Sequence, residues 1–277
     1  VARRGARQVA AEDRPDDRRP RQATSPPRAA TGRAAPAEGE RWVEEPAPPH
    51  PGAAGRPPPA RRRRPYSRQR VDEEVARQIS AAVPHRRAGR VLERVAEAAI
   101  ALEEDRPRDA LRALRPVLAE ASEAPAVREL AGLSLYRLGR WSEAVGHLEA
   151  FRRLSGSVDQ HPVLADCYRA LGRFAAADEL WAELRRASPS AALVTEGRIV
   201  AAGALADQGQ LGQAIRLLEG APKPRRRPAE HHLRLWYALA DLYERVGDTP
   251  RARELFSRVA AADPALADTA ERLQALS

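Results

Sequence analysis

The chain has 277 residues, of which 47 are Lys or Arg and 38 are Asp or Glu, so its formal net charge is +9. No segment approaches the run of about 18 apolar residues that a membrane-spanning helix needs, and the N-terminus lacks the apolar stretch of a secretory signal. The only cysteine, Cys167, cannot form an internal disulfide, which agrees with a reducing compartment. We therefore expect a cytoplasmic protein.

The net charge is concentrated in residues 1–70. They contain 17 Arg, no Lys, 8 acidic residues and 13 of the 24 Pro, which leaves 30 basic and 30 acidic residues in the rest of the chain. With few large apolar residues, this segment cannot offset a backbone entropy cost of about 1–2 kcal/mol per residue. The sequence predicts a disordered Arg/Pro-rich tail over residues 1–70 and a folded part over residues 71–277 without net charge.

A short helix is expected directly after the tail. Val71, Val75, Ile79 and Val83 recur every four residues, and Pro84 then interrupts the pattern. This spacing predicts a helix over residues 71–83 that caps the first repeat.

A single pattern then recurs from residue 91 to residue 264, centred on a turn residue. The turn residues are Asp105, Gly139, Gly172, Gly209 and Gly247. Seven residues before each stands a small residue, in the order Ala98, Gly132, Ala165, Ala202 and Ala240. Five residues after each stands an alanine, in the order Ala110, Ala144, Ala177, Ala214 and Ala252. Nine residues after each stands a large apolar residue, in the order Leu114, Leu148, Trp181, Leu218 and Phe256.

The spacing describes a pair of helices joined by a turn. Apolar residues three and four apart in each half indicate helices with one buried face, and small residues let two helices approach closely. Glycine supplies the turn conformation that other residues adopt only at a cost. A unit of this size cannot bury its own apolar face, so the copies are expected to stack. They span approximately residues 91–124, 125–157, 158–194, 195–232 and 233–264.

The last unit carries the most complete motif. Its residues Trp236, Leu239, Ala240, Tyr243, Gly247, Ala252, Phe256 and Pro264 resemble the tetratricopeptide repeat family. The resemblance extends over roughly residues 91–264 and implies an all-α fold, a right-handed α-solenoid of about five helix-turn-helix repeats. Lys223 is the only lysine, and Asn and Met are absent. This composition is typical of a bacterial-type member from a high-G+C genome.

The end of the chain repeats the capping pattern. Leu266, Ala270, Leu273 and Leu276 predict a capping helix over residues 265–276, because a solenoid must cover its last apolar face. Further upstream, Thr249 is expected to cap the helix that begins with Pro250.

The family resemblance implies that a partner lies along the inner face, built mainly from the first helix of each repeat. Residues of those helices that point away from the packing positions are expected to form a mixed-charge partner-binding groove. They are Glu129, Leu133, Tyr136, Arg137, Asp166, Arg169, Tyr237, Asp241, Glu244 and Arg245. Members that clamp a peptide carboxylate use lysine and asparagine there, so the absence of Asn argues against that kind of clamp.

Two basic patches are candidates for electrostatic binding. The first is in the tail, and the second is in an insertion before the last repeat. Their residues are Arg61, Arg62, Arg63 and Arg64, and Lys223, Arg225, Arg226 and Arg227. Either patch could contact a phosphate or an acidic partner, or be a solvated segment of an arginine-rich sequence.

No motif indicates catalysis. Cys167 is interpreted as a small packing residue, because His161 lies on another face of the same helix. His231 and His232 point about 100° apart on a helix and cannot both bind one ion. No phosphate-binding loop or catalytic carboxylate pair is found, so we expect no enzyme activity, no metal and no other cofactor.

Three functional hypotheses follow. The first is a non-enzymatic protein–protein interaction scaffold that holds a partner segment on its concave face. The alternative is a nucleic-acid-associated protein that uses the arginine-rich tail for electrostatic, non-specific binding. Self-association through the terminal faces is a third possibility.

Overall fold

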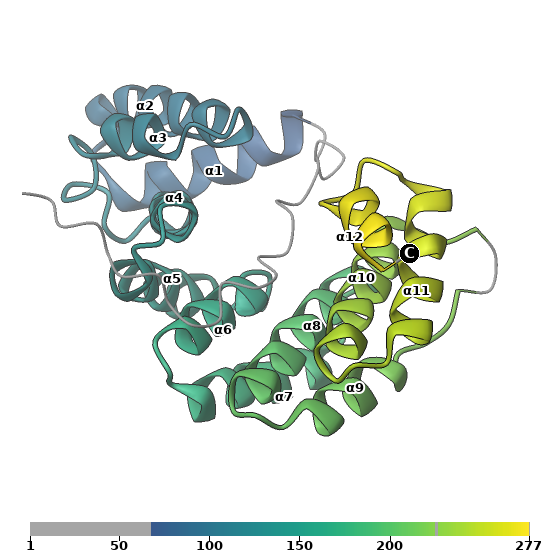
Figure 1. The fold of residues 1–277 in the computed structure, drawn as a ribbon. Helices are drawn as coiled ribbons and strands as arrows, with labels where there is room; N and C mark the ends of the chain where they lie inside the picture. The colour runs from purple at the N-terminus through teal and green to yellow at the C-terminus, as the bar shows by residue number, and fades with distance from the viewer. Residues whose placement is uncertain (1–67, 225–226, 277) are drawn as a thin grey trace, which may run out of the picture. The chain divides into compact units, whose positions relative to one another are not determined.

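The computed structural model describes residues 68–224 and 227–276, with side chains from residue 73 onward. Within these ranges the chain is all-α, without a strand, and forms the helices α1 to α12 (Figure 1). The predicted disordered tail lies, up to residue 67, outside the described residues.

Ten helices of the described chain form five consecutive pairs, each joined by a short turn. They are α2 (His85–Glu103) with α3 (Pro107–Leu114), α4 (Pro125–Arg137) with α5 (Trp141–Ser155), α6 (His161–Ala170) with α7 (Phe174–Ala187), α8 (Ala191–Asp207) with α9 (Leu211–Glu219), and α10 (Glu230–Arg245) with α11 (Thr249–Ala262). Helices α1 (Arg68–Ala82) and α12 (Thr269–Ala275) flank them.

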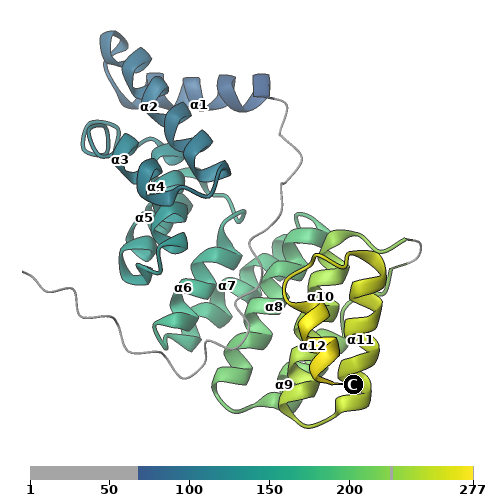
Figure 2. The same ribbon diagram turned by 45° about the horizontal axis from the view of Figure 1, so that its top comes forward.

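The pairs stack as a solenoid. In each pair the two helices pack on each other, and the first helices α2, α4, α6, α8 and α10 each contact the next one in this order (Figures 1 and 2). Each second helix also contacts the following first helix. A residue at a given position of the pattern therefore lies near its counterpart in the neighbouring repeat.

The five predicted turn residues share one backbone conformation. The φ angles are 74°, 70°, 77° and 80° at Gly139, Gly172, Gly209 and Gly247, and 56° at Asp105. Aspartate is among the few residues that reach this region without glycine's freedom. The shared angle confirms that Asp105 takes the glycine's place in the first pair.

Close packing explains the small residues of the pattern. All five alanines that follow the turns are buried, and so are the five small residues that precede them. At Gly132, a Cβ atom would lie 2.7 Å from both Cγ and Cδ2 of Leu148, the large residue on the partner helix. Four of the five large residues are also buried. The exception is Trp181, which is half-buried beneath the Arg198 guanidinium, 5.6 Å from the ring centroid.

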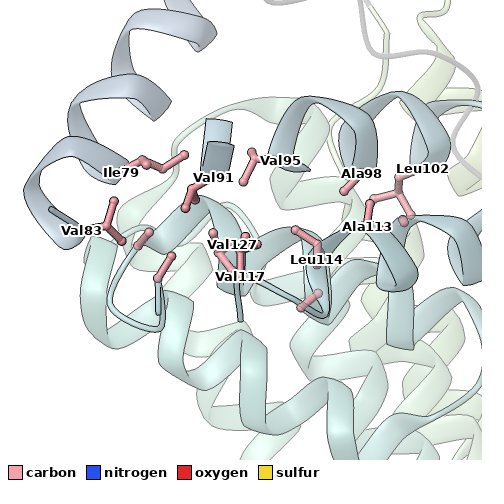
Figure 3. Close-up of a cluster of buried hydrophobic side chains, with 14 of the residues drawn as sticks. Ile79, Val83, Val91, Val95, Ala98, Leu102, Ala113, Leu114, Val117 and Val127 are labelled. Carbon is pink, nitrogen blue, oxygen red and sulfur yellow. The ribbon is translucent and has the colours of Figure 1, made fainter. Parts of the chain in front are cut away.

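The first hydrophobic cluster joins α1 to the first repeat. Ile79 and Val83 pack with Val91 and Val95 of α2 and with Val127 of α4 (Figure 3). Helix α1 covers residues 68–82, three residues earlier at its start than the predicted 71–83, and ends one residue before the buried Val83.

Two helices are shorter than the pattern indicates. Helix α3 ends at Leu114 because Pro116 has no amide hydrogen to continue the ladder, and the chain proceeds in turns that still bury Val117. Helix α12 begins at Thr269 rather than 265, because the Asp263 carboxylate accepts from the Ala265 amide and Ala267 has a φ of 51°.

The cap of α11 also differs from the expectation. Asp248 is the N-cap, and its Oδ1 accepts from the Arg251 amide at 3.2 Å. Thr249 is the first helical residue. The prediction of Thr249 as the cap was wrong by one position, because aspartate and threonine are both good caps and stand side by side.

Candidate partner-binding surface

The ten residues predicted to line a partner-binding groove lie on α4, α6 and α10. The structure places them where successive repeats meet. Asp166, Tyr237 and Asp241 are buried, so the prediction that these side chains point away from the packing positions is wrong. The spacing within one repeat does not show which side chains the next repeat covers.

A chain of polar contacts joins three first helices. The Tyr136 hydroxyl of α4 donates to Asp166 Oδ2 of α6 at 2.7 Å. Arg169 Nε donates to Asp166 Oδ1 at 2.8 Å, and its Nη1 donates to Asp207 Oδ2 of α8 at 2.5 Å. Burial, with the negative charge of Asp166, raises the pKa of Tyr136 far above its ordinary value, so the phenol remains a donor. These groups hold neighbouring repeats together.

The position two residues before the turn also contacts the preceding repeat. Arg137 donates to the Leu102 carbonyl and lies 3.4 Å from Asp105 Oδ1. Arg245 Nη2 reaches the Ala206 carbonyl at 3.5 Å. Both carbonyls are in the last turn of a first helix, where the helix dipole favours a cation. The two arginines therefore have the same structural role in repeats far apart in the chain.

At the C-terminal end, α12 covers part of the predicted groove. Arg272 Nη2 donates to Asp241 Oδ1 at 2.9 Å and to Glu244 Oε2 at 2.7 Å, and its Nε donates to Glu244 Oε2 at 3.0 Å. The Tyr237 hydroxyl donates to Asp268, just before α12. Three of the predicted groove residues are thus engaged by the chain's own last helix.

Glu129 and Leu133, the last two of the ten predicted groove residues, also contact other parts of the chain. Gln160, which precedes α6, donates through Nε2 to Glu129 Oε1 of α4 at 2.6 Å. Leu133 is half-buried and packs against the first hydrophobic cluster.

One further contact between repeats was missed. Glu183 of α7 accepts from Arg152 Nη2 of α5 at 2.8 Å and lies 3.0 Å from His161 Nε2. Burial alone would raise the pKa of Glu183, but the hydrogen bonds from His161 and Arg152 outweigh it and lower the pKa. His161 stands in the place of the motif's tryptophan and is 3% exposed.

Sequence reasoning also missed Asp207, Gln160 and Arg272 as partners of the predicted groove residues. A signal existed in the repeat spacing, because the contacting pairs are 28 to 38 residues apart in the chain. The spacing pattern describes positions within one repeat, whereas these contacts connect one repeat to the next.

Helix α6 and the start of α10 contain the other candidate side chains. Cys167 is completely buried, and burial together with Asp166 raises the pKa of its thiol to about 12, which fits a packing residue. The rings of His231 and His232 lie 4.0 Å apart and are tilted by 35°. Residues 68–224 and 227–276 contain no group of three His, Cys, Asp or Glu side chains that could hold a metal.

The two basic patches are only partly described. Lys223 and Arg227 are exposed at the two sides of the insertion between α9 and α10. Arg225 and Arg226 lie outside the described residues, as do the four consecutive arginines of the tail. In the part of the chain that the structure describes, no helix combines the length and the apolar character needed to cross a membrane.

Comparison with known proteins agrees with this geometry. The tetratricopeptide repeat family model matches residues 95–158 and 200–267. A crystal structure of a thermophilic tetratricopeptide repeat protein from Thermus thermophilus superimposes with a TM-score of 0.53 at 17% sequence identity, covering 66% of this chain and 97% of that chain. No curated protein matches by sequence.

The α6–α7 pair lies between the two matched stretches, yet Gly172 and Ala177 have the conformation and burial of their counterparts. The repeat therefore runs without interruption from α2 to α11. Five stacked helix pairs with one shared turn conformation, together with the family-model match over residues 95–158 and 200–267, show that helices α2 to α11 form an array of tetratricopeptide repeats.

Proposed function

We propose that the chain is a protein-interaction scaffold that binds an extended or helical segment of a partner protein along the first helices of its repeats. Tetratricopeptide repeats commonly serve as scaffolds for protein–protein interaction and are in general not enzymes. The observation that carries the proposal is the continuous stacking of α2, α4, α6, α8 and α10, which aligns equivalent positions of successive repeats into rows.

One such row has the exposure that a docked segment requires. It is the position two residues before each turn, occupied by Glu103, Arg137, Ala170, Asp207 and Arg245. Four of these residues are exposed, and Arg137 is half-buried. The row has charges of both signs on either side of the neutral Ala170, which suits a polar partner segment. We call it the inner row.

Reversing the charge of Arg137, Arg169 or Arg245 would not give a clear test of partner binding along the inner row. Each of these side chains contacts a neighbouring repeat, so its loss changes the stacking as well as the surface. Ala170 is better suited, because it is exposed, is the last residue of α6 and has no side-chain polar contact to lose.

The experiment compares Ala170→Arg with Ala187→Arg. Ala187 is also exposed and is the last residue of α7, the second helix of the same repeat. Both substitutions place an arginine at a helix C-terminus, where the dipole favours it, so both variants are expected to fold. The full chain and each variant are used to capture proteins from a native lysate, and the captured proteins are quantified by mass spectrometry.

We expect at least one protein to be recovered by the unmodified chain and by Ala187→Arg but depleted about tenfold or more with Ala170→Arg. A bulky cation in the inner row would obstruct the docked segment, whereas the same cation on α7 would not. Equal recovery with all three baits would refute binding along the inner row.

The charge distribution favours a second candidate. Residues 71–277 carry equal numbers of basic and acidic residues, so the whole net charge of +9 comes from residues 1–70. We infer that any nucleic-acid binding is electrostatic and belongs to this segment. Its affinity should fall steeply between about 50 and 200 mM salt and disappear when residues 1–70 are deleted. Binding that survives the deletion would contradict this inference.

A further inference from the structure

Helix α12 is attached to the last repeat by side chains that stay partly exposed, among them Leu273, which packs against the last hydrophobic cluster. It has seven residues, and only Thr269 among them is buried. A hollow of about 550 Å³ between α11 and α12 is lined by Ser257 of α11 and by Ala270 and Leu273 of α12. A helix of seven residues has little stability of its own in water, so its position depends on these contacts.

The polar attachment of α12 to α10 is a single guanidinium group. Arg272 makes three hydrogen bonds to Asp241 and Glu244, and its Cζ atom lies 5.2 Å from the centroid of the Phe256 ring. Two carboxylates beside an aromatic face are suited to the flat, forked guanidinium group and much less to an ammonium group. We call Asp241, Glu244 and Phe256 the guanidinium site.

The position of α12 corresponds to that of a missing repeat. In the interior of the stack, the first helix is covered by the next first helix, as α4 is joined to α6 through Tyr136 and Asp166. At α10 this place is taken by α12, which lies beside α10 and α11 in both views (Figures 1 and 2). Three of the ten predicted groove residues, Tyr237, Asp241 and Glu244, are engaged there.

We propose that α12 is a displaceable strap, and that a partner protein binds the last repeat by inserting an arginine from a helical segment into the guanidinium site in place of Arg272. The occupant is identified by the group already seated there, which is an arginine on a helix between two carboxylates and a phenyl ring. This inference rests on the proposed scaffold function and names both the chemistry of the partner and the contact that restrains its binding.

The test uses the full chain and a fluorescein-labelled synthetic peptide with the sequence of residues 264–277, followed by fluorescence anisotropy. The peptide should bind the Arg272→Ala chain at least about tenfold more tightly than the unmodified chain, because the site is then empty. A peptide with Lys in place of its arginine should lose most of this affinity, and so should the native peptide with an Arg272→Ala chain that also carries Asp241→Asn and Glu244→Gln.

Arg258→Ala is the matched control, because Arg258 is an exposed residue of α11 paired only with Glu254 on its own helix. It removes the same charge and should leave peptide binding as in the unmodified chain. If Arg272→Ala does not fold, Arg272→Lys replaces it, with an expected gain of about threefold or more.

Equal peptide affinity for the Arg272→Ala and Arg258→Ala chains, or for the arginine and lysine peptides, would overturn the proposal. The scaffold function is tested separately by the Ala170→Arg capture, which examines a surface three repeats from α12. Failure of the peptide experiment with a positive capture result would reject the strap alone.

Discussion

The close approach of α4 and α5 at Gly132 leads to a quantitative prediction. In Gly132→Ala, the added methyl group would lie 2.7 Å from Leu148 Cγ and Cδ2 and 3.3 Å from the Leu148 amide nitrogen. Leu148 is completely buried, and its Cγ is too close to the backbone for a rotamer change to relieve the clash. The two helices must therefore move apart, or the core must rearrange.

The expected magnitude follows from two opposing effects. Overpacking of a filled core costs about 1–3 kcal/mol, and replacing glycine by alanine inside a helix returns up to about 1 kcal/mol. We expect a net loss of about 1–2 kcal/mol. For a folded part of this size, that loss lowers the thermal midpoint measured by far-UV circular dichroism by about 2–8 °C.

The same repeat provides the control. Gly146 lies within α5, is exposed, and has no atom within 4 Å of the position of an added Cβ. Gly146→Ala should therefore stabilise the chain by about 0.5–1 kcal/mol. In a Leu148→Ala background, Gly132→Ala should lose most of its cost, because the clashing atoms are gone. A raised midpoint for Gly132→Ala in the otherwise unmodified chain would refute the packing argument.

Three further predictions concern single side chains. Because burial raises the pKa of Cys167 to about 12, the thiol should not react with Ellman's reagent at pH 8 until the chain is denatured, and rapid reaction of the folded chain would contradict its burial. Asp248→Ala should cost about 1 kcal/mol and Thr249→Ala less than about 0.5 kcal/mol in thermal melts, with the opposite order excluding Asp248 as the cap. The pKa of Glu183 is lowered by neighbouring donors that outweigh its burial, so this carboxylate stabilises the fold above its ordinary pKa of 4.5 and the stabilisation is lost as the pH falls through the lowered value. Glu183→Gln should therefore be less stable than the unmodified chain at pH 7, with a difference that closes in acid, and a pH-independent difference would count against this reasoning.

The repeat register is the part of the fold that sequence reasoning recovered best. The positions of Gly132, Ala144 and Leu148 relative to Gly139 predicted which residues are buried, because backbone approach and turn conformation restrict those positions to few residue types. Even Asp105 was placed correctly, although a single degenerate copy would not have been recognised alone.

The candidate surface was predicted less well. Asp166 and Tyr237 have polar groups and stand at positions that are not restricted to small residues, so the spacing within one repeat predicts that they face solvent. Their burial depends on Tyr136 and on Asp268, residues that are 30 and 31 positions away along the chain. The side chains that connect repeats follow no fixed residue type, and their partners differ from one repeat to the next.

The sequence by itself determined the helical pairs, their turns and the buried face of each helix, because these features depend on periodicity and on steric limits that act within a repeat. Only the tertiary structure decided which of the remaining polar residues stay exposed. Arg169 and Arg272 are occupied by contacts to other helices, whereas Glu103 remains exposed in the inner row. The physical reason is that a stacked repeat covers part of its neighbour's polar face, and the extent of this cover depends on the packing of one unit against the next.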